Sequence, residues 1–481
     1  MLMEVGLPVD RLTQSATPRS GVGIVHLGLG AFYRAFGAIY VAEAMAASGG
    51  DWGIVGVSLK SPKTRDALAP QNWAYTSVTL AESGESTQVI DVLEDVLVAP
   101  EDPAAVLEAM ADPGVRIVSL TVTEKGYCHN PATGELALDH PNSAHDLRQE
   151  LPRSAPGFLV RALARRRADG VAPFTVLSCD NLPENGALVR KIVLDFAYLI
   201  DPSLAQWIAG NARFPATMVD RITPATTPND IARVTAMTGL YDGAPVLHEP
   251  FRQWVIEDNF VEGVRPDFEA VGIEMVKDVT GFEQMKLRML NGSHSALAYL
   301  GYLAGHETVS DTVADPAFTA YVRQLWGEIM PVVRAPQGFD LHDYAQALME
   351  RYANPKIRHR TWQIAMDGSQ KLPQRLLSSL EANIAAGKPA PGLCLAVAAW
   401  MYYVGGIDQS GRPIEVKDPM AERLRALSDA ANTPADKVAA LLSLSEIFPP
   451  ELAETLKAPV TEAAQILWTQ GARQAALQVV T

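Results

Sequence analysis

Cysteine is scarce in this chain of 481 residues, which has three of them. Cys128, Cys179 and Cys394 lie far apart, and no CxxC pair is present. A disulfide framework of the kind found in small secreted proteins is therefore excluded. We expect a protein that works in a reducing compartment, the cytoplasm.

Long hydrophobic runs are also missing. The longest, residues 393–404, is shorter than the roughly 20 apolar residues that a membrane-spanning helix needs, so it predicts a buried helix. The first residues, MLMEVGLPVDRLTQS, lack the basic start and apolar run of a signal peptide. We therefore expect no membrane partner.

Positive charge is in deficit. The chain has 40 Lys and Arg residues against 55 Asp and Glu residues, which gives a formal net charge of -15. The densest basic run, residues 161–167, is short and typical of an exposed helix face. This balance argues against nucleic acids and anionic membranes as partners.

The sequence also lacks the common metal and nucleophile motifs. The nine histidines show no HExxH and no His–Cys ligand spacing, so no metal site is predicted. Neither a Walker loop nor a G-x-S-x-G turn is present, which removes the sequence signals of P-loop NTPases and α/β-hydrolases.

The first half of the chain alternates strand-like and helix-like segments. This alternation, with apolar strands, predicts an α/β, Rossmann-like domain whose mostly parallel sheet is covered by helices on both faces. The expected strands are residues 22–29, 51–59, 88–97, 115–123, 174–179 and 216–222, and the expected helices are 36–47, 103–111 and 157–168.

From about residue 281 the strand-like runs nearly vanish. Amphipathic segments punctuated by proline and glycine follow one another, which predicts a mainly α-helical second domain. We place the domains at residues 1–280 and 281–481. The helices expected in the second are residues 282–303, 316–332, 341–352, 373–386, 393–404, 419–431, 434–444 and 460–481.

The first expected strand ends in Gly28-Leu29-Gly30, and a helix follows. Two glycines let the backbone approach a pyrophosphate, and a helix start supplies N–H groups and positive potential. The third glycine position of the dinucleotide fingerprint G-x-G-x-x-G is occupied by Tyr33, so the match is partial. We interpret residues 1–280 as a dinucleotide-binding domain. The alternative is an ordinary turn.

The tip of the second expected strand bears on which dinucleotide binds. NAD sites usually place Asp or Glu about 20 residues after the glycines, where it binds the ribose. Here Ser58 and Lys60 stand at the strand tip, and no carboxylate does. We expect NAD, and this pattern leaves NADP open.

Lys286, Asn291 and His294 lie in one short segment, KLRMLNGSHS. On an α-helix with about 100° per residue, Asn291 and His294 fall roughly 140° and 80° around the axis from Lys286, so all three can reach one cavity. A lysine, an amide and an imidazole directed at one point make a proton-transfer site. We therefore expect residues 281–481 to hold the substrate and catalytic groups. The alternative is a buried helix with a lysine that reaches solvent and a satisfied histidine.

With these residues in view, the chain resembles the polyol-specific long-chain dehydrogenase/reductase (mannitol dehydrogenase) family over nearly its whole length. One departure is that family members commonly have a histidine where Tyr33 and Phe36 stand. Within the family it looks most similar to fructuronate reductases, and Gln363 lies where mannitol dehydrogenases are expected to have an arginine. The motifs are GLGAFYRAF (28–36), SLTVTEKGY (119–127), SCDNLPENG (178–186), MVDRITP (218–224), EPFRQWVIEDNF (249–260), KLRMLNGSHS (286–295) and MDGSQKLPQR (366–375).

The resemblance implies roles for the reacting groups. Lys286 would be the general base, which needs a pKa of roughly 7–8 rather than the usual 10.4 or so. Asn291 and Asn181 would donate hydrogen bonds to the reacting oxygen, and His294 would orient the substrate. Asp220 would position substrate or Lys286. The alternative role for Asp220 is a structural salt bridge with Arg221 or another basic residue.

The resemblance also implies supporting roles. Glu283 and Glu124 match acids that conduct protons, although Glu283 at a helix start also suits the helix dipole. Lys371 matches a substrate-contacting lysine, and Arg360 or Arg358 are further candidates to bind a sugar-acid carboxylate. The expected cofactor contacts are Gly28, Gly30, Phe32, Arg34 and Ser58.

These observations favour a metal-independent, nicotinamide-dependent oxidoreductase acting on an open-chain sugar acid, D-fructuronate reduced to D-mannonate. The alternative substrate is mannitol or a related polyol oxidised to a ketose. Two alternatives are not enzymes. One is a regulatory protein that senses the nicotinamide ratio, and the other is a helical scaffold that binds no cofactor. We expect a monomer or a weak homodimer.

Overall fold

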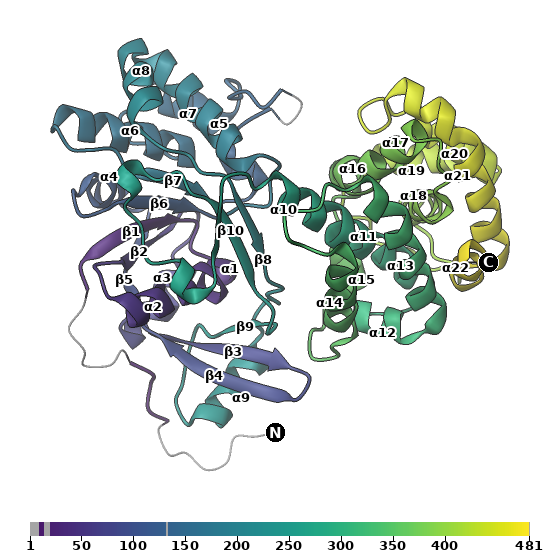
Figure 1. The fold of residues 1–481 in the computed structure, drawn as a ribbon, viewed down its shortest axis with the longest axis horizontal. Helices are drawn as coiled ribbons and strands as arrows, with labels where there is room; N and C mark the ends of the chain where they lie inside the picture. Colours follow the sequence, from purple (N-terminus) through teal and green to yellow (C-terminus); the bar gives the residue numbers. More distant parts are fainter. Residues whose placement is uncertain (1–8, 14–19, 131–132, 481) are drawn as a thin grey trace. The chain divides into compact units, whose positions relative to one another are not determined.

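The structure of the chain is a computed structural model, and it describes residues 9–13, 20–130 and 133–480. The chain divides into two compact units, residues 1–279 (unit 1) and 280–481 (unit 2), each of which is described by itself. Unit 1 contains the sheets and unit 2 is built from helices (Figure 1). The predicted fold class, a Rossmann-like parallel sheet followed by a mainly helical part, is confirmed.

Unit 1 is built on a five-stranded parallel sheet with the order β5-β2-β1-β6-β7. Every residue of β2, β6 and β7 is buried, as expected for a sheet covered on both faces. The order reverses between β1 and β6, because β2 and β5 extend to one side of β1 and β6 and β7 to the other. The strands are β1 (Val22–Leu27), β2 (Gly53–Ser58), β5 (Leu93–Val98), β6 (Ile117–Leu120) and β7 (Thr175–Ser178).

Neighbouring residues of the central strand pack into two separate cores. Val25 and Leu27 of β1 belong to one core and Ile24 to the other, since successive side chains of a strand point to opposite faces. Each fully buried side chain of this size contributes about 1.5–3 kcal/mol. The first core includes helices α4 (Pro103–Ala111), α6 (Ala155–Ala168) and α7 (Asn185–Ile200), and the second includes α2 (Gly37–Ser48).

Two three-stranded sheets complete unit 1 and correct two strand predictions. Residues 88–97 are not one strand, because Asp91 and Val92 separate β4 from β5 and the apolar run hides this break. The segment 216–222 contains a strand, β8, but it pairs antiparallel with β10 outside the parallel sheet. The members are β3 (Tyr75–Ala81), β4 (Gly84–Ile90) and β9 (Val246–His248) in one sheet, and β8 (Thr217–Asp220), β10 (Gln253–Glu257) and β11 (Glu274–Val276) in the other.

The helix predicted at residues 36–47 is broken at its start. A short helix, α1 (Ala31–Ala35), ends before Phe36, whose backbone is not helical, and α2 begins at Gly37. A Cβ on Gly37 would lie 2.4 Å from Cε2 of Tyr33. Glycine at this position therefore lets the two helices meet around the Tyr33 ring.

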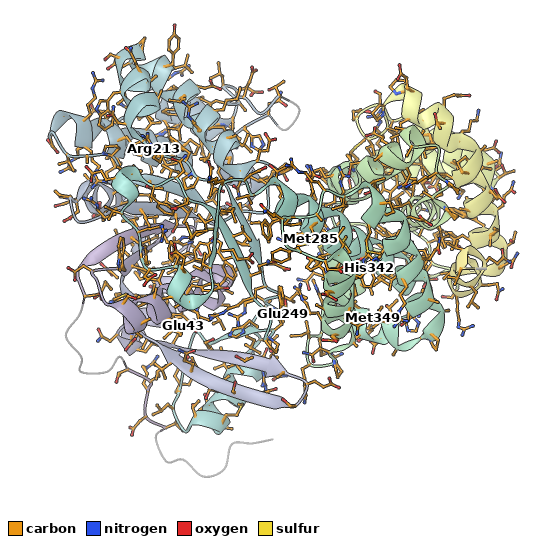
Figure 2. The ribbon with its side chains drawn as sticks, viewed as in Figure 1. Glu43, Arg213, Glu249, Met285, His342 and Met349 are labelled. Carbon is orange, nitrogen blue, oxygen red and sulfur yellow. The ribbon has the colours of Figure 1, made fainter. Side chains whose placement is uncertain are left out.

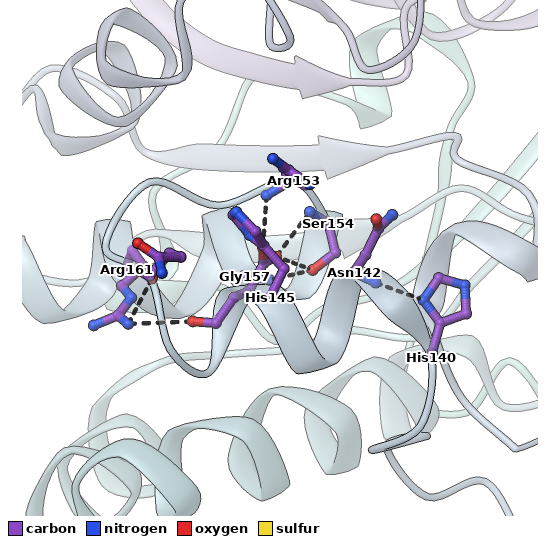
Figure 3. Close-up of polar contacts among 9 residues, drawn as sticks. His140, Asn142, His145, Arg153, Ser154, Gly157 and Arg161 are labelled. Atoms are coloured by element: carbon purple, nitrogen blue, oxygen red, sulfur yellow. Dashed lines mark hydrogen bonds and ion pairs between the residues drawn. The ribbon is translucent and has the colours of Figure 1, made fainter.

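A buried carboxylate, Asp146, holds the segment before α6 in place. It accepts hydrogen bonds from the backbone N–H groups of Arg153 and Ser154 at 2.9 Å and from the Ser154 hydroxyl at 2.6 Å. Ser154 in turn caps α6, since its Oγ accepts from the N–H of Gly157 at 3.1 Å (Figure 3). The donors compensate the cost of burying the charge.

Unit 2 is arranged around two helices, α11 (Ser293–Leu303) and α18 (Pro391–Tyr403), which contact each other and are buried along most of their length. In the described part of the chain, no helix is both long and apolar enough to cross a membrane. The other helices are α10 (Thr280–Met285), α12 (Val309–Ala314), α13 (Pro316–Ile329), α14 (Leu341–Ala353), α15 (Thr361–Ile364), α16 (Gly368–Leu372), α17 (Ser378–Ala385), α19 (Ala421–Ala430), α20 (Pro434–Leu442), α21 (Pro450–Gln470) and α22 (Ala472–Val480).

Three helix predictions in unit 2 are wrong in detail. Residues 460–481 are not one helix, because Gly471 (φ 84°) ends α21 and α22 starts after it. The predicted helices at 282–303 and 373–386 each contain a π-helical stretch. The first of these begins directly after Met285, which Figure 2 labels at the end of α10.

Candidate active site

The carboxyl end of β1 leads into the glycine turn. Gly28 has φ +91°, and a Cβ there would lie 2.3 Å from the carbonyl oxygen of Thr121. Gly30 has an ordinary φ of -111°, and the nearest atom to its Cβ position is the Gly28 oxygen at 3.8 Å. The fold therefore requires glycine at position 28, whereas a Cβ on Gly30 would make only an ordinary van der Waals contact beside the start of α1.

The glycine turn lies where the strand order of the parallel sheet reverses, between β1 and β6. In open α/β sheets, ligands bind at this point, outside the carboxyl ends of the strands. Ser58 ends β2 at the same edge and is buried, and its carbonyl oxygen accepts from the N–H of Ala99 at 2.9 Å. Asn181, which follows β7, comes to this edge as well because the strands are parallel.

Asp180, which the sequence interpretation passed over, links the ends of β6 and β7. Its carboxylate accepts from the N–H groups of Val122 and Thr123, each at 2.9 Å, and from the hydroxyl of Tyr127 at 2.7 Å. Burial raises the pKa of Asp180, while these hydrogen bonds act in the opposite direction. The three bonds fix the two loops that follow β6 and β7 against each other.

Three other predicted residues of unit 1 lie in or beside these loops and on β8. Asn181 directly follows Asp180, and its side chain is exposed. Glu124 begins a 3-10 turn and is half-buried. Asp220, the last residue of β8, is buried. Their catalytic and relay roles stay predictions.

Arg34, a predicted cofactor contact, points into the protein. It is buried, its Nη1 donates to the carbonyl oxygen of Ala244 at 2.5 Å, and its guanidinium lies over the ring of Tyr75, 5.2 Å from the centroid. Phe32 is half-buried and stacks on Phe36 at 5.2 Å. The guanidinium of Arg34 thus serves the packing of unit 1.

Tyr33 stands at the third glycine position of the fingerprint, and the structure shows how it is accommodated. Its ring stacks on His26 of β1 with centroids 3.3 Å apart. His26 is buried and bonds to the hydroxyls of Ser119 and Thr121 at 2.8 Å each. Burial lowers the pKa of His26, so this ring is neutral. Tyr33 therefore fills space between β1 and the helices rather than facing the turn.

Lys286 begins a π-helix, which corrects the α-helical geometry predicted for this segment. The π-helix covers residues 286–292 and lies in the chain after α10 and before α11. In a π-helix each backbone hydrogen bond joins residues five positions apart. Asn291, five residues after Lys286, therefore returns to nearly the same side of the axis instead of lying about 140° away. Asn291 and His294 are buried and Lys286 is half-buried. Single-turn π-helices occur frequently at functional sites.

Side chains from two other helices stabilise this π-helix. Nε1 of Trp326 donates to the carbonyl oxygen of Met289 at 3.1 Å. The hydroxyl of Tyr352 donates to the carbonyl oxygen of Leu290 at 2.9 Å. A π turn changes the pattern of backbone hydrogen bonds, so some carbonyl groups need a donor from outside the helix. Each such hydrogen bond contributes about 1 kcal/mol of stability. Both donors are distant in sequence, and no local pattern predicts them.

A second π-helix, residues 373–377, packs against the first. Pro373 follows α16 without a break, and in an α-helix its ring would clash with the carbonyl group four residues earlier. The π turn relieves this clash. Gly292 permits the close packing, because a Cβ on it would lie 2.6 Å from the carbonyl oxygen of Arg375.

The His294 ring is held between two other rings. It stacks on Tyr352 with centroids 5.0 Å apart, and His359 meets it edge-on at 4.7 Å and 83°. Burial is the largest cause of the strongly lowered pKa of His294, and cationic neighbours, Arg375 and Lys371 among them, lower it further. A neutral imidazole can donate one hydrogen bond and accept another.

Lys371, on α16, lies in the same electrostatic environment. Its Nζ donates to the carbonyl oxygens of Met366 at 2.5 Å and Ile364 at 3.4 Å. Burial and the charge of Arg375 lower the pKa of Lys371 to about 8. An ammonium group has three N–H donors, so one remains for a further acceptor.

Arg360 and Arg358, the other predicted carboxylate ligands, are exposed. Arg358 pairs with Glu307 at 3.3 Å. Arg375 is more enclosed: it is half-buried, and its Nη1 donates to Oγ of Ser295 at 3.1 Å. The enclosed cations near His294 therefore include Arg375, Arg351 and Lys371, and Arg351 is the most buried of the three.

Asn291 has an unused donor. Among the described residues its Nδ2 has no hydrogen-bond partner, although the atom is buried. A buried polar group left unpaired costs about 1–3 kcal/mol, and a role in ligand binding is one explanation for tolerating that cost. The role of Asn291 in the reaction stays a prediction.

Family comparisons agree with this organisation. The model of the mannitol dehydrogenase Rossmann domain matches residues 22–270, and that of the mannitol dehydrogenase C-terminal domain matches residues 278–468. The chain belongs to the mannitol dehydrogenase family. The resemblance inferred from the sequence is confirmed, and the protein is an oxidoreductase of this family.

Members of the mannitol dehydrogenase family with different named substrates are similar to this chain. D-mannonate oxidoreductase of Escherichia coli (strain K12) is 47% identical over 481 residues, covering 98% of each chain. Mannitol 2-dehydrogenase of Aspergillus fumigatus is 42% identical over 441 residues, 89% of this chain and 87% of that protein. A Pseudomonas fluorescens mannitol 2-dehydrogenase, solved as a ternary complex with NAD and D-mannitol, matches with a TM-score of 0.88 and 38% identity, covering 98% of this chain and 97% of that one. Identity alone does not choose between a sugar acid and a polyol.

Proposed function

We propose that the protein transfers a hydride between NAD and an open-chain sugar acid, reducing D-fructuronate to D-mannonate or running the reverse reaction. The observation that carries this choice is the set of enclosed cations beside His294, which includes Lys371 and Arg375. Cationic donors of this kind suit a substrate that ends in a carboxylate. The similarity to D-mannonate oxidoreductase over the whole chain supports it.

The glycine turn of unit 1 suits a dinucleotide. Gly28 makes the tight turn, Gly30 leaves room for a pyrophosphate, and the turn lies at the reversal of strand order. When bound, the nicotinamide would accept the hydride from the carbinol carbon or return it to the ketone. Ser58 and Lys60 at the end of β2 would lie near the adenosine ribose. The absence of an acid there keeps NADP as an alternative.

Within unit 2, Lys286 would take the hydroxyl proton during oxidation and return it during reduction. Asn291, with its unpaired amide donor, would stabilise charge on the reacting oxygen. Neutral His294 would orient the substrate by a hydrogen bond. General acid–base catalysis by a positioned group contributes about 10²–10⁴-fold.

Residues of unit 1 and of α10 are proposed to assist. Asn181 would donate a second hydrogen bond to the reacting oxygen, and Asp220 would position the substrate or the lysine. Glu283 and Glu124 would conduct protons to water. No metal is proposed, since no group of His, Cys, Asp and Glu side chains in the described ranges could hold one. We further propose a cytoplasmic monomer or weak homodimer.

The second candidate function is oxidation of mannitol to a ketose. The match to the structure solved with NAD and D-mannitol, and the relative from Aspergillus fumigatus, favour it. Steady-state rates with D-fructuronate plus NADH, set against D-mannitol plus NAD, decide between the two, and NADPH and NADP in parallel decide the cofactor. We expect kcat/KM to be higher for the sugar acid. A clear preference for mannitol overturns the proposed substrate.

A further inference from the structure

His359, to which the sequence analysis gave no role, lies directly beside the proposed substrate-orienting histidine. It follows α14 and precedes α15, and its ring meets His294 at 4.7 Å and 83°. Its backbone is fixed, because its N–H donates to Ile357 and its carbonyl oxygen accepts from Val309 at 3.1 Å. These bonds hold the backbone in place, and the edge-on contact with His294 places the ring.

The two ring nitrogens of His359 have different surroundings. In the described part of the chain, Nδ1 is buried and has no hydrogen-bond partner, while the residue as a whole is half-buried. Within the described ranges, the buried ring nitrogen without a partner is Nδ1 alone, which leaves Nε2 as the nitrogen open to a ligand. Placing the proton on Nε2 avoids burying an N–H group without an acceptor. Neutral His359 then presents a donor at Nε2.

The charges around His359 favour an anion as the acceptor. Burial is the main cause that lowers the pKa of His359, to about 4, and the two charged groups that add to it are both cations, Lys371 and Arg375. Lys371 has one N–H left beyond its two carbonyl partners. A carboxylate arriving here would meet donors and offset the repulsion among the cations.

We propose that His359 selects substrates that end in a carboxylate, by donating its Nε2–H to that carboxylate beside Lys371. This inference rests on the proposed sugar-acid reaction and names the residue that distinguishes the acid from a polyol. A hydroxymethyl group at the same place is a weaker partner, because hydrogen bonds to charged groups are about twice as strong as those between neutral groups.

The test compares oxidation of D-mannonate and D-mannitol with NAD in the full-length protein and three variants. The substrates differ at one end, where the acid has a carboxylate and the polyol a hydroxymethyl group. His359→Leu removes both nitrogens, His359→Gln keeps an N–H donor near the position of Nε2, and His359→Asn moves it toward the position of Nδ1. Thermal unfolding and NAD binding of each variant establish that it is folded.

For His359→Leu we expect the KM for D-mannonate to rise about 10- to 100-fold, the loss of one hydrogen bond to a charged group, with kcat changed far less. The KM for D-mannitol should stay the same. His359→Gln should keep most of the preference for the acid and His359→Asn should lose it. If the leucine variant does not fold, the difference between His359→Gln and His359→Asn supplies the same test.

Equal loss for both substrates in His359→Leu, or no loss for either, overturns the inference and leaves the sugar-acid function intact. Equal behaviour of the glutamine and asparagine variants also overturns it. A wild-type protein that prefers D-mannitol is a different result, because it overturns the proposed substrate itself. Failure of the inference and failure of the proposed function are thereby separated.

Discussion

The two units place their candidate residues by different means. Unit 1 uses the ends of regular parallel strands, where Gly28, Ser58 and Asn181 come to one edge of a sheet. Unit 2 uses helices that leave α geometry, since Lys286 and Asn291 lie on one π-helix and Arg375 on another. A strand-end site follows from topology, whereas a π-helical site depends on side chains that reach it from elsewhere in the unit.

The largest effect on stability is expected at the glycine turn of unit 1. Gly28→Ala adds a Cβ 2.3 Å from the Thr121 oxygen at a positive φ, which should destabilise the protein by about 2–5 kcal/mol from overpacking and left-handed strain. Thermal or urea unfolding measures the change. In Gly30→Ala, the control, the nearest atom to the Cβ is 3.8 Å away, an ordinary contact, so stability should hold while the KM for NAD rises. Equal stability of the two variants would contradict the conclusion that the fold requires glycine at position 28 but not at position 30.

A smaller effect is expected where the two π-helices meet in unit 2. Gly292→Ala puts a Cβ 2.6 Å from the Arg375 oxygen, which should cost about 1–3 kcal/mol and lower kcat by displacing Asn291. The matched control is Gly327→Ala in α13, where a Cβ meets nothing within 4 Å. That variant should gain about 0.5–1 kcal/mol, the usual gain for alanine over glycine in a helix. Urea unfolding and kcat are measured for both, and a stable, fully active Gly292→Ala would show that the close packing is unimportant.

The loops at the strand ends of unit 1 should be sensitive to Asp180. Asp180→Asn keeps the size of the side chain but replaces one accepting oxygen with a donor, so at least one of three hydrogen bonds is lost, at about 1–2 kcal/mol. If Asn181 and Glu124 act in the reaction, kcat should fall as well. Loss of stability with unchanged kcat would assign Asp180 a purely structural role.

Both units should lose stability in mild acid through histidines whose pKa is lowered in the folded state. Burial lowers the pKa of His248 in unit 1 and of His359 in unit 2, each to about 4 from 6.5. Between these values the unfolded chain binds more protons than the folded one, so the stability that these groups contribute is present above pH 6.5 and lost as the pH falls toward 4. Urea unfolding from pH 4 to 7 measures this. His359→Gln should make the pH dependence shallower, and an unchanged slope would show that His359 does not titrate in this way.

The site at the strand ends of unit 1 could be predicted from the sequence more fully than the π-helical site of unit 2. The parallel sheet, the glycine turn and the helical second half could be predicted because period, composition and Gly28 are local signals. The π-helix at Lys286 could not, since its supports, Trp326 and Tyr352, are distant in the chain. Pro373 within a helical run was a signal for the second π-helix that the sequence interpretation took for a helix start.

Residues with partners in another element were the hardest to predict. Asp180 appeared to be part of a turn, and only the structure shows its bonds to the loop after β6. Only the structure shows that the guanidinium of Arg34 packs against Ala244 and Tyr75, and its contact with the cofactor stays a prediction. His359 lies in a short basic run, residues 358–360, and nothing in that run indicates which member packs on His294.

The central claim is that Lys286 transfers the proton in a reaction whose hydride goes to or from the nicotinamide. The direct test is turnover of Lys286→Ala at neutral pH, measured together with its affinity for NAD by calorimetry. We predict a loss of about 10²–10⁴-fold in kcat with NAD affinity unchanged. Full turnover in this variant would contradict the claim and remove Lys286 from the mechanism.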